Sequence, residues 1–452
     1  MAGLYLGVQP ARLASSKEIK NNGCRSLAGA EFSMPAHNLI RRIYNALPPT
    51  LRYHAWRLKR AKDVRDTRDC LTAIPEQTLS FSALSPGLNI IGFFSSVMGL
   101  GEAAWSAWRG VSEVGLPAHI VDIPLIDRIS ADVVLPQNQV NTCFPINVFH
   151  FNPDSIRLLM REELSYYYRA ARYNIGYWFW ETTRLPEYWV EAASLFDEIW
   201  TGSQFCWETF AGSIGKPVFK IPLNLYPTAE LDQASAREEL GLPTDRYIFL
   251  TMMDVMSQPE RKNPLAALDA FDKAFEYGNK EVCLVVKALN RIPGAHDELM
   301  QRCAKHPGII VIDRALSRNG VNALFNAVDC FMSLHRAEGF GLPIAEAMSL
   351  GKPVVATGWS GNMEFMTEEN SFPVDYTLKK FDRPALPYPK GGLWAEPNIE
   401  HAAAIMRTLV DSPGIGVGVG QRAKADILRS LSPQKTGASV RSRLEEIWCN
   451  LK

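Results

Sequence analysis

The sequence lacks net charge, since Lys plus Arg and Asp plus Glu both total 48 over its 452 residues. A dedicated nucleic-acid-binding protein normally carries a basic excess, so we expect no nucleic-acid partner. The eight cysteines form no Cys-x-x-Cys pair, which argues against a disulfide framework and against a zinc module. No Asp-x-Asp occurs, nor a His, Cys and Asp cluster with ligand spacing. We therefore predict neither a metal site nor a bound cofactor.

Long apolar runs are also missing. The nearest one, residues 88–108, is interrupted by Gly92, Gly99, Gly101 and Glu102, so the sequence predicts no transmembrane span. The first residues lack the charged start and apolar core of a secretory signal. Together with the scattered cysteines, this pattern indicates a soluble, reduced protein of the cytoplasm.

Basic charge is concentrated at one end of the chain. Residues 1–85 carry 13 Lys and Arg against six Asp and Glu. Within them, residues 39–44 and 51–60 interleave apolar and basic side chains, a pattern that can lie on an anionic membrane surface. We expect residues 1–85 to form a basic N-terminal extension, partly disordered and partly helical. It is either a solvated arm or a peripheral contact with the inner face of the membrane.

From residue 88 onward, short apolar runs alternate with helix-like segments. This alternation is typical of parallel sheets covered by helices on both faces. The alternation stops at residues 222–245, which we interpret as a linker, and then resumes. The sequence thus predicts an α/β protein with two Rossmann-like, doubly wound domains, 86–225 and 226–431, facing a central cleft. Residues 432–452 have a helix-forming composition and are expected to pack back on the first domain. The expected strands are residues 89–94, 118–122, 146–151, 174–180, 198–201, 247–251, 282–287, 309–313, 329–334 and 353–357.

The strongest chemical signal is the segment Glu-Gly-Phe-Gly-Leu-Pro-Ile-Ala-Glu at residues 338–346. It follows a predicted strand and leads into a helix, with Pro343 near the first helical position. Its glycines expose backbone N–H groups at a helix N-terminus, which suits phosphate oxygens. The carboxylates of Glu338 and Glu346 suit sugar hydroxyls, so the segment fits a nucleotide sugar. The alternative is an ordinary helix cap with acidic residues near its start.

Glu338 and Glu346 form an E-x7-E pair, and residues 351–357 and 358–364 follow it with Gly-Lys-Pro-Val-Val-Ala-Thr and Gly-Trp-Ser-Gly-Asn-Met-Glu. These features resemble the family 4 (group 1) retaining glycosyltransferases, which have the GT-B fold. The resemblance implies that Glu346 binds the donor ribose and that Glu338 addresses the transferred hexose. It also implies that the second domain binds the donor and the first the acceptor. The other donor-binding candidates in this turn are Gly339, Phe340, Gly341 and Leu342.

Three cations are further donor-binding candidates. Arg261 and Lys262 precede a predicted helix, where they could neutralise charge on the departing diphosphate. The family places an Arg five residues before the Lys; position 257 is Ser in this chain, so adjacent Arg261 is the substitute. Lys287 ends a predicted strand, with its stem buried and its tip in water. The alternative for Arg261 and Lys262 is a solvated pair of charges.

A second glycine-rich run, Gly-Leu-Gly-Glu-Ala-Ala at residues 99–104, precedes another predicted helix. In the glycosyltransferase interpretation, Gly99 and Gly101 line the cleft and let the donor approach the backbone. Alternatively they form a dinucleotide fingerprint, with Asp122 on a ribose, which would make the chain an NAD-dependent oxidoreductase. The glycines begin five residues after Phe94 rather than directly at the strand end, which weakens that alternative.

His150 and Glu181 complete the catalytic candidates, beside Glu338. His150 ends a strand of the first domain and so lies at the edge that faces the predicted cleft. Glu181 stands close to where many family members have a His, and Trp178 and Trp180 precede it. We therefore predict a hexosyltransferase that uses a nucleotide-diphosphate sugar and a saccharide or glycolipid acceptor in polysaccharide or glycolipid biosynthesis. A sugar-binding module without turnover is the remaining alternative.

Overall fold

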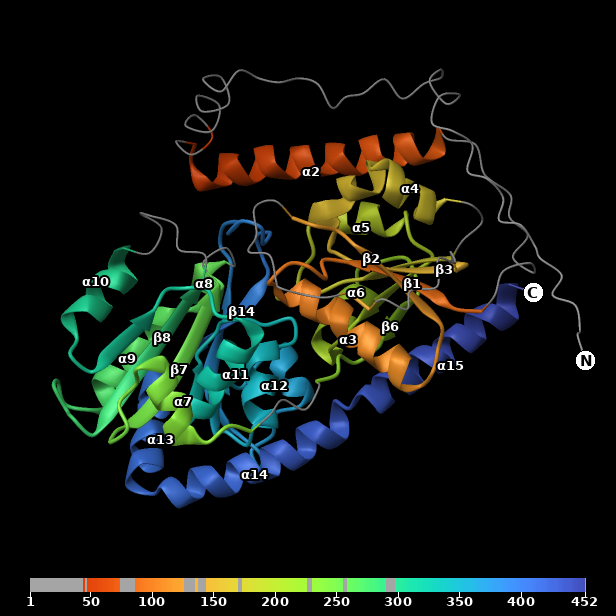
Figure 1. The fold of residues 1–452 in the computed structure, drawn as a ribbon. Helices are drawn as coiled ribbons and strands as arrows, with labels where there is room; N and C mark the ends of the chain where they lie inside the picture. The colour runs from red at the N-terminus through yellow and green to blue at the C-terminus, as the bar shows by residue number, and fades with distance from the viewer. Residues whose placement is uncertain are drawn as a thin grey trace, which may run out of the picture.

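The computed structural model describes residues 44, 47–73, 86–125, 135–136, 144–169, 173–225, 230–254, 258–289 and 297–451. They form two lobes that lie side by side, each built on a parallel sheet (Figure 1). Within the N-terminal extension we expect disorder in residues 1–35, and these lie outside the described residues.

The first lobe contains a six-stranded parallel sheet of order β2-β1-β3-β4-β5-β6. All five residues of β1 and of β3 are buried, as their apolar sequences require in a sheet covered on both faces. Gly92 of β1 pairs with His150 of β3 at the carboxyl edge of the sheet. The strands are β1 Leu88–Gly92, β2 Ala118–Asp122, β3 Ile146–His150, β4 Tyr173–Tyr177, β5 Glu198–Thr201 and β6 Val218–Lys220.

Helices cover both faces of this sheet. The helices α3 (Gly99–Glu113) and α15 (Pro433–Leu451) pack together on one face. On the other face, a cluster rich in Trp and Phe packs under η2 (Pro153–Met160), α4 (Glu162–Tyr168), α5 (Glu187–Ala193) and α6 (Gln204–Ala211). The long helix α2 (Pro49–Thr72) lies outside this layer on η2 and α5 (Figure 1).

The second lobe repeats the plan with a parallel sheet of order β12-β11-β10-β7-β8-β9. Strand order reverses beside β7, and ligands of open α/β sheets bind at the carboxyl ends of strands near such a point. The strands are β7 Tyr247–Asp254, β8 Val282–Leu289, β9 Ile309–Ile312, β10 Cys330–Ser333, β11 Val354–Thr357 and β12 Phe372–Val374. The helices are α7 Gln233–Leu240, α8 Pro259–Lys262, α9 Pro264–Ala274, α10 Asp297–Lys305, α11 Arg318–Ala327, α12 Leu342–Ser349, η3 Gly361–Glu364, α13 Ile399–Asp411 and α14 Pro413–Ser430. Two Rossmann-like sheets confirm the predicted fold class.

Two features of the second lobe depart from the expectations. The presumed linker at residues 222–245 contains the helix α7, which Asp232 caps by accepting a hydrogen bond from the Ser235 backbone N–H at 2.9 Å. An antiparallel hairpin of β13 (Tyr376–Lys380) and β14 (Leu393–Pro397) follows β12. The sequence did not indicate this hairpin, because all five residues of β13 are exposed and form no apolar run.

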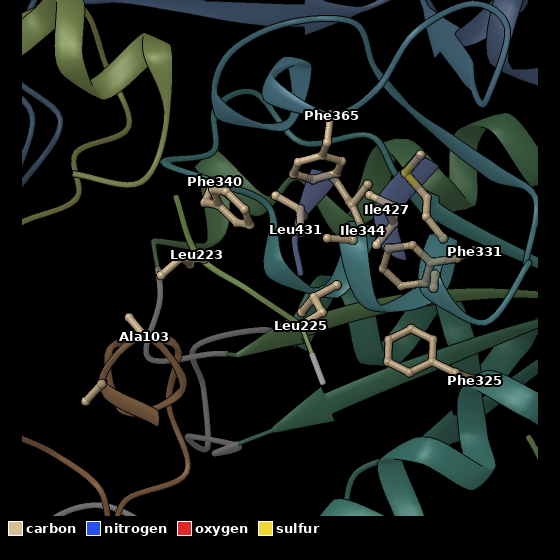
Figure 2. Packing of buried hydrophobic residues seen from close by; sticks show 14 of the residues in the cluster. Ala103, Leu223, Leu225, Phe325, Phe331, Phe340, Ile344, Phe365, Ile427 and Leu431 are labelled. Carbon is tan, nitrogen blue, oxygen red and sulfur yellow. The ribbon is translucent and has the colours of Figure 1, made fainter. Parts of the chain in front are cut away.

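Helix α15 returns from the second lobe to the first (Figure 1). Arg443 of α15 pairs with the fully buried carboxylate of Glu198 on β5 at 2.6 Å. Apolar side chains from α3, from the segment after β6 and from α11, α12 and α14 pack in one cluster between the lobes (Figure 2). No helix among the described residues is long and apolar enough to span a membrane.

Candidate active site

The turn at residues 338–341 lies between β10 and α12. Gly341 caps α12 in the left-handed conformation with φ 90°, which glycine adopts without strain, and Pro343 occupies the first turn of the helix. The Glu338 N–H donates to Ser360 Oγ at 2.8 Å. In the described part of the chain, the N–H groups of residues 339–342 have no hydrogen-bond acceptor. These N–H groups are therefore unpaired donors at a helix N-terminus, in a turn whose residues 338–341 are buried.

Glu338 is buried and forms two ion pairs. Its Oε1 lies 2.5 Å from Lys262 Nζ, and its Oε2 lies 3.2 Å from Arg261 Nη1. Both cations come from the short helix α8, which ends at Asn263 in the left-handed conformation. Arg261 Nη1 also donates to the carbonyl oxygen of Ala337 at 2.8 Å. The structure thus brings the three donor-site candidates Arg261, Lys262 and Glu338 into one cluster.

Glu181 extends this cluster from the first lobe. Its Oε1 lies 3.7 Å from Arg261 Nη2, and its Oε2 accepts a hydrogen bond from the Tyr388 hydroxyl at 3.2 Å. Tyr388 belongs to the loop between β13 and β14 and is buried. Two carboxylates from different lobes therefore share one guanidinium, in a cluster that spans the boundary between the lobes.

The two carboxylates differ in their electrostatics. Burial by itself would raise the pKa of Glu338, but the charges of Lys262 and Arg261 outweigh it and lower the pKa to about 2. Burial raises the pKa of Glu181, and the more distant Arg261 only partly opposes this. Glu338 is therefore firmly ionised, whereas Glu181 is the carboxyl that gains a proton more readily.

Glu346 lies in a second charged cluster. Its Oε1 is 2.6 Å from Arg318 Nη2, at the start of α11. The other end of the Arg318 guanidinium lies 4.0 Å from Glu102 in the first turn of α3. Burial raises the pKa of Glu346, and the Arg318 charge opposes the rise. A small cavity of about 10 Å³ adjoins this pair, lined by Leu225, Arg318, Val321, Asn322, Phe325, Glu346, Ser349 and Leu350.

The glycine-rich turn also touches the first lobe directly. The carbonyl oxygen of Gly339 accepts a hydrogen bond from Ser203 Oγ at 2.6 Å. A side chain at Gly339 would stand 3.3 Å from Phe179 Cβ and from the Trp180 carbonyl oxygen. Nearby, Glu364 accepts from the Gln204 N–H at 2.7 Å. The predicted donor turn therefore lies at the junction of the lobes.

The glycines of the first lobe lie at the start of α3, the helix whose first turn carries Glu102. Gly101 is required by close packing, because a Cβ there would stand 2.6 Å from the Phe93 carbonyl oxygen. Around Gly99, by contrast, no atom of the described residues lies within 4 Å of an added Cβ, apart from its chain neighbours and its own helix backbone. Asp122 accepts a hydrogen bond from the Ser95 N–H at 2.9 Å, so its carboxylate braces the turn before α3. Asp122 is therefore engaged in a contact within the protein, whereas the dinucleotide interpretation uses its carboxylate to bind a ribose.

His150 and Lys287 lie apart from the two charged clusters. His150 is fully buried and stacks on Tyr177 with ring centroids 4.7 Å apart, and burial lowers its pKa to about 3. Both its ring nitrogens are without a hydrogen-bond partner among the described residues. Lys287 is buried to its tip, where Nζ donates to the Ala288 carbonyl oxygen at 3.0 Å. The prediction that its ammonium group reaches water is therefore wrong. Trp178 and Trp180 both pack in the core against Trp189.

Sequence reasoning missed the side chains that complete the two clusters. Tyr388 and Arg318 lie in segments without a recognisable motif, and each meets its partner only through the tertiary fold. Ser360, by contrast, adjoins the turn from a segment that the resemblance already included. In the described ranges, no group of three or more His, Cys, Asp and Glu side chains is arranged to hold a metal ion.

Comparison with known proteins identifies one part of the chain. Residues 249–381 match the family model described as glycosyl transferases group 1. This range covers the sheet of the second lobe from β7 onward and both residues of the E-x7-E pair. The likeness to group 1 glycosyltransferases therefore lies in the second lobe. No curated protein matches the chain in sequence.

Solved structures of low sequence identity share the whole two-lobed fold. Sucrose-phosphate synthase from Thermosynechococcus elongatus is 12% identical, with a TM-score of 0.59 and coverage of 81% of this chain and 100% of that one. Anabaena HepE in complex with UDP and glucose is 14% identical, with a TM-score of 0.56 and coverage of 80% and 100%. A glycosyltransferase from Rickettsia africae is 13% identical, with a TM-score of 0.57 and coverage of 80% and 97%. The architecture is thus that of the GT-B glycosyltransferases.

Proposed function

We propose that the chain transfers a hexose from a nucleotide-diphosphate sugar to an acceptor hydroxyl, with retention of anomeric configuration, as a family 4 glycosyltransferase. The observation that supports this best is the turn at residues 338–341. There, unpaired N–H groups stand beside Glu338 at the junction of the lobes, inside the matched domain. UDP-sugars are the first donors to test, because HepE has been solved with UDP-glucose.

In this proposal the second lobe binds the donor. The N–H groups of the turn, with Arg261 and Lys262, bind the diphosphate and neutralise the charge that develops on it as the sugar leaves. In other enzymes a metal ion can neutralise this charge. Glu346 accepts hydrogen bonds from the ribose hydroxyls in place of its pairing with Arg318. Glu338 is held ionised by its two cations and accepts a hydrogen bond from the hexose.

The test is a panel of UDP-glucose, UDP-galactose, UDP-N-acetylglucosamine and GDP-mannose, with release of nucleoside diphosphate as the readout. We expect release from one donor, and an NMR spectrum of the sugar product that keeps the donor's anomeric configuration. Glu338→Gln should lower kcat at least 100-fold, because a group that acts on the reacting sugar is lost. Equal rates for Glu338→Gln and the wild type would remove the catalytic assignment.

We further propose that the chain works in the cytoplasm on a saccharide or glycolipid acceptor of polysaccharide or glycolipid biosynthesis, and that α2 docks peripherally on the inner face of the membrane. The outward side of α2 exposes Leu51 and Leu58 together with Lys59, Lys62 and Arg65. Apolar and basic side chains on one exposed helix face suit an anionic bilayer.

Sedimentation with vesicles tests this docking. The wild type should bind vesicles that contain phosphatidylglycerol more strongly than pure phosphatidylcholine vesicles. A Leu51→Ser, Leu58→Ser double variant should lose most of that binding. Tyr277→Ser, which removes an exposed aromatic side chain from the second lobe, is the control that should bind as the wild type does. Equal sedimentation of the double variant and the wild type would contradict the docking.

A further inference from the structure

The loop between β13 and β14 crosses from the second lobe to the first. The Leu393 N–H donates to Thr183 Oγ1 at 3.1 Å, and Arg184 Nη1 donates to the Lys390 carbonyl oxygen at 3.1 Å. The Tyr388 ring packs on the Trp180 ring, with centroids 5.2 Å apart. The loop thus binds the segment that follows β4, in the lobe expected to hold the acceptor.

The innermost contact of this loop is the hydrogen bond from Tyr388 to Glu181. Tyr388 is 2% exposed, and its hydroxyl donates to Glu181 Oε2 at 3.2 Å. The other carboxylate oxygen faces Arg261 at 3.7 Å. Glu181 is therefore held by two groups of the opposite lobe, a hydroxyl on one oxygen and a guanidinium near the other.

Glu181 differs from Glu338 in how tightly its charge is balanced. Glu338 lies within 3.2 Å of two cations, whereas Glu181 has a single cation, at 3.7 Å. Burial accordingly raises the pKa of Glu181, while its neighbours lower the pKa of Glu338 to about 2. Where the environment separates two carboxyl groups in this way, the one with the raised pKa is suited to proton transfer.

We propose that Glu181 takes the proton of the acceptor hydroxyl, and that Tyr388 is a positioning residue which fixes the Glu181 carboxylate when the lobes are together. The inference rests on the proposed glycosyl transfer and adds the acceptor-side group to it. In the step, the acceptor O–H bond breaks and its proton goes to Glu181. The acceptor oxygen bonds to the anomeric carbon on the face from which the diphosphate departs, so that the configuration is retained. The bond from that carbon to the diphosphate oxygen breaks, and its electron pair leaves with the nucleoside diphosphate.

This arrangement couples proton transfer to closure of the cleft. Tyr388 and Arg261 belong to the second lobe and Glu181 to the first, so the three groups meet only when the lobes are together. In a more open cleft, Glu181 would lie away from the donor turn of the other lobe, so it could not take a proton from water beside the activated sugar. Loss of the activated sugar to water is thereby limited before the acceptor is enclosed.

The experiment measures nucleoside diphosphate release by the full chain from the nucleotide-sugar panel as a function of pH. The groups that face Glu181 are Cys206 of the first lobe and Arg261, Lys262, Glu338 and Tyr388 of the second. Because a base acts when deprotonated, wild-type kcat should rise with pH through the pKa of Glu181. Glu181→Gln should lower kcat about 100-fold. It should also remove the acidic limb of the profile, the range in which kcat rises with pH.

Tyr388→Phe separates positioning from mere packing. It keeps the ring but removes the hydrogen bond that lowers the pKa of Glu181, so the limb should move to higher pH. We expect kcat to fall about tenfold with the donor KM unchanged, since the hydroxyl holds a base rather than the donor. Tyr376→Phe, at an exposed tyrosine of the same hairpin, and Glu187→Gln, at an exposed carboxylate of α5, should retain the wild-type profile.

The outcomes separate this inference from the function on which it rests. A Glu181→Gln variant with wild-type kcat and an unchanged acidic limb overturns the inference. Should Glu181→Gln fail to fold, Tyr388→Phe decides: an unmoved limb overturns the positioning role, and a limb moved to higher pH supports it. If the wild type releases no nucleoside diphosphate from any donor and binds neither UDP nor GDP, the proposed function itself is contradicted.

Discussion

Glu338 shows how single residues set the chemistry of this site. A buried carboxylate is costly unless it is paired, and Glu338 is paired twice, with Lys262 and with Arg261. These pairings keep it ionised at any pH near neutrality, with a pKa of about 2. A carboxylate with so low a pKa can hold a sugar hydroxyl and position cations, but it is poorly suited to take a proton from the acceptor. This difference supports the separate tasks that we propose for Glu338 and Glu181.

The charge of Glu338 should be visible in the pH dependence of stability. Its pKa in the folded protein is lowered to about 2 from the ordinary value of 4.5 for a glutamate, so the stabilisation is present above pH 4.5 and is lost as the pH falls toward 2. Glu338→Gln should therefore be less stable than the wild type by about 3 kcal/mol at pH 7. The difference should shrink below pH 4.5. Urea unfolding followed by tryptophan fluorescence from pH 7 to pH 3 measures it.

A matched control separates this effect from general acid destabilisation. Glu187→Gln removes an exposed carboxylate that pairs with Arg57, so it should change stability little at any pH. A difference between Glu338→Gln and the wild type that stays constant from pH 7 to pH 3 would contradict the assigned pKa.

Part of the candidate site could be predicted from the sequence, and part could not. The turn at residues 338–346 combines glycine, proline and carboxylates within nine positions, so its geometry follows from local rules. The contact between Tyr388 and Glu181 joins residues 207 positions apart, and no local pattern marks it. Lys287 was expected to reach water, but its ammonium is enclosed and bonded to a backbone carbonyl. Enclosure of this kind depends on packing between elements, which the sequence of one strand does not contain.

At the scale of elements, the sequence predicted strands well where they are buried. Near-continuous apolar runs such as β8 mark strands covered on both faces. The three-residue strands β6 and β12 and the hairpin of β13 and β14 carry no such signal, and the sequence did not predict them. The hairpin is nevertheless the element that brings Tyr388 to the first lobe.

The crossing of α3 and α15 depends on two glycines. A Cβ at Gly437 would stand 2.1 Å from the Gly110 carbonyl oxygen, so the helix backbones touch at this point. Gly437→Ala should separate the helices and lower the free energy of unfolding by about 1–3 kcal/mol, which a thermal unfolding curve can measure. Gly418→Ala in α14, where the nearest atom to an added Cβ lies 3.8 Å away, should be neutral or stabilising. A Gly437→Ala protein as stable as Gly418→Ala would refute this account of the crossing.

At the scale of the whole molecule, the lobes are joined twice over. An apolar cluster, part of which Figure 2 shows, and the returning helix α15 connect them. Polar groups also meet across the boundary: Ser203 with Gly339, Gln204 with Glu364, and Glu181 with Arg261 and Tyr388. The apolar connection buries hydrophobic area, which favours keeping the lobes joined there. The polar contacts lie at the proposed donor and acceptor groups, where we expect the lobes to part and close.

The most direct measurement of the central claim is thermal unfolding of the wild type with UDP, GDP and NAD added separately. A ligand that binds only the folded chain stabilises it by about 2.7 kcal/mol at 100 times its Kd. We predict that UDP or GDP raises the midpoint while NAD leaves it unchanged, because the unpaired N–H groups beside Glu338 receive a diphosphate and Asp122 is engaged with Ser95. A midpoint raised by NAD alone would contradict the account.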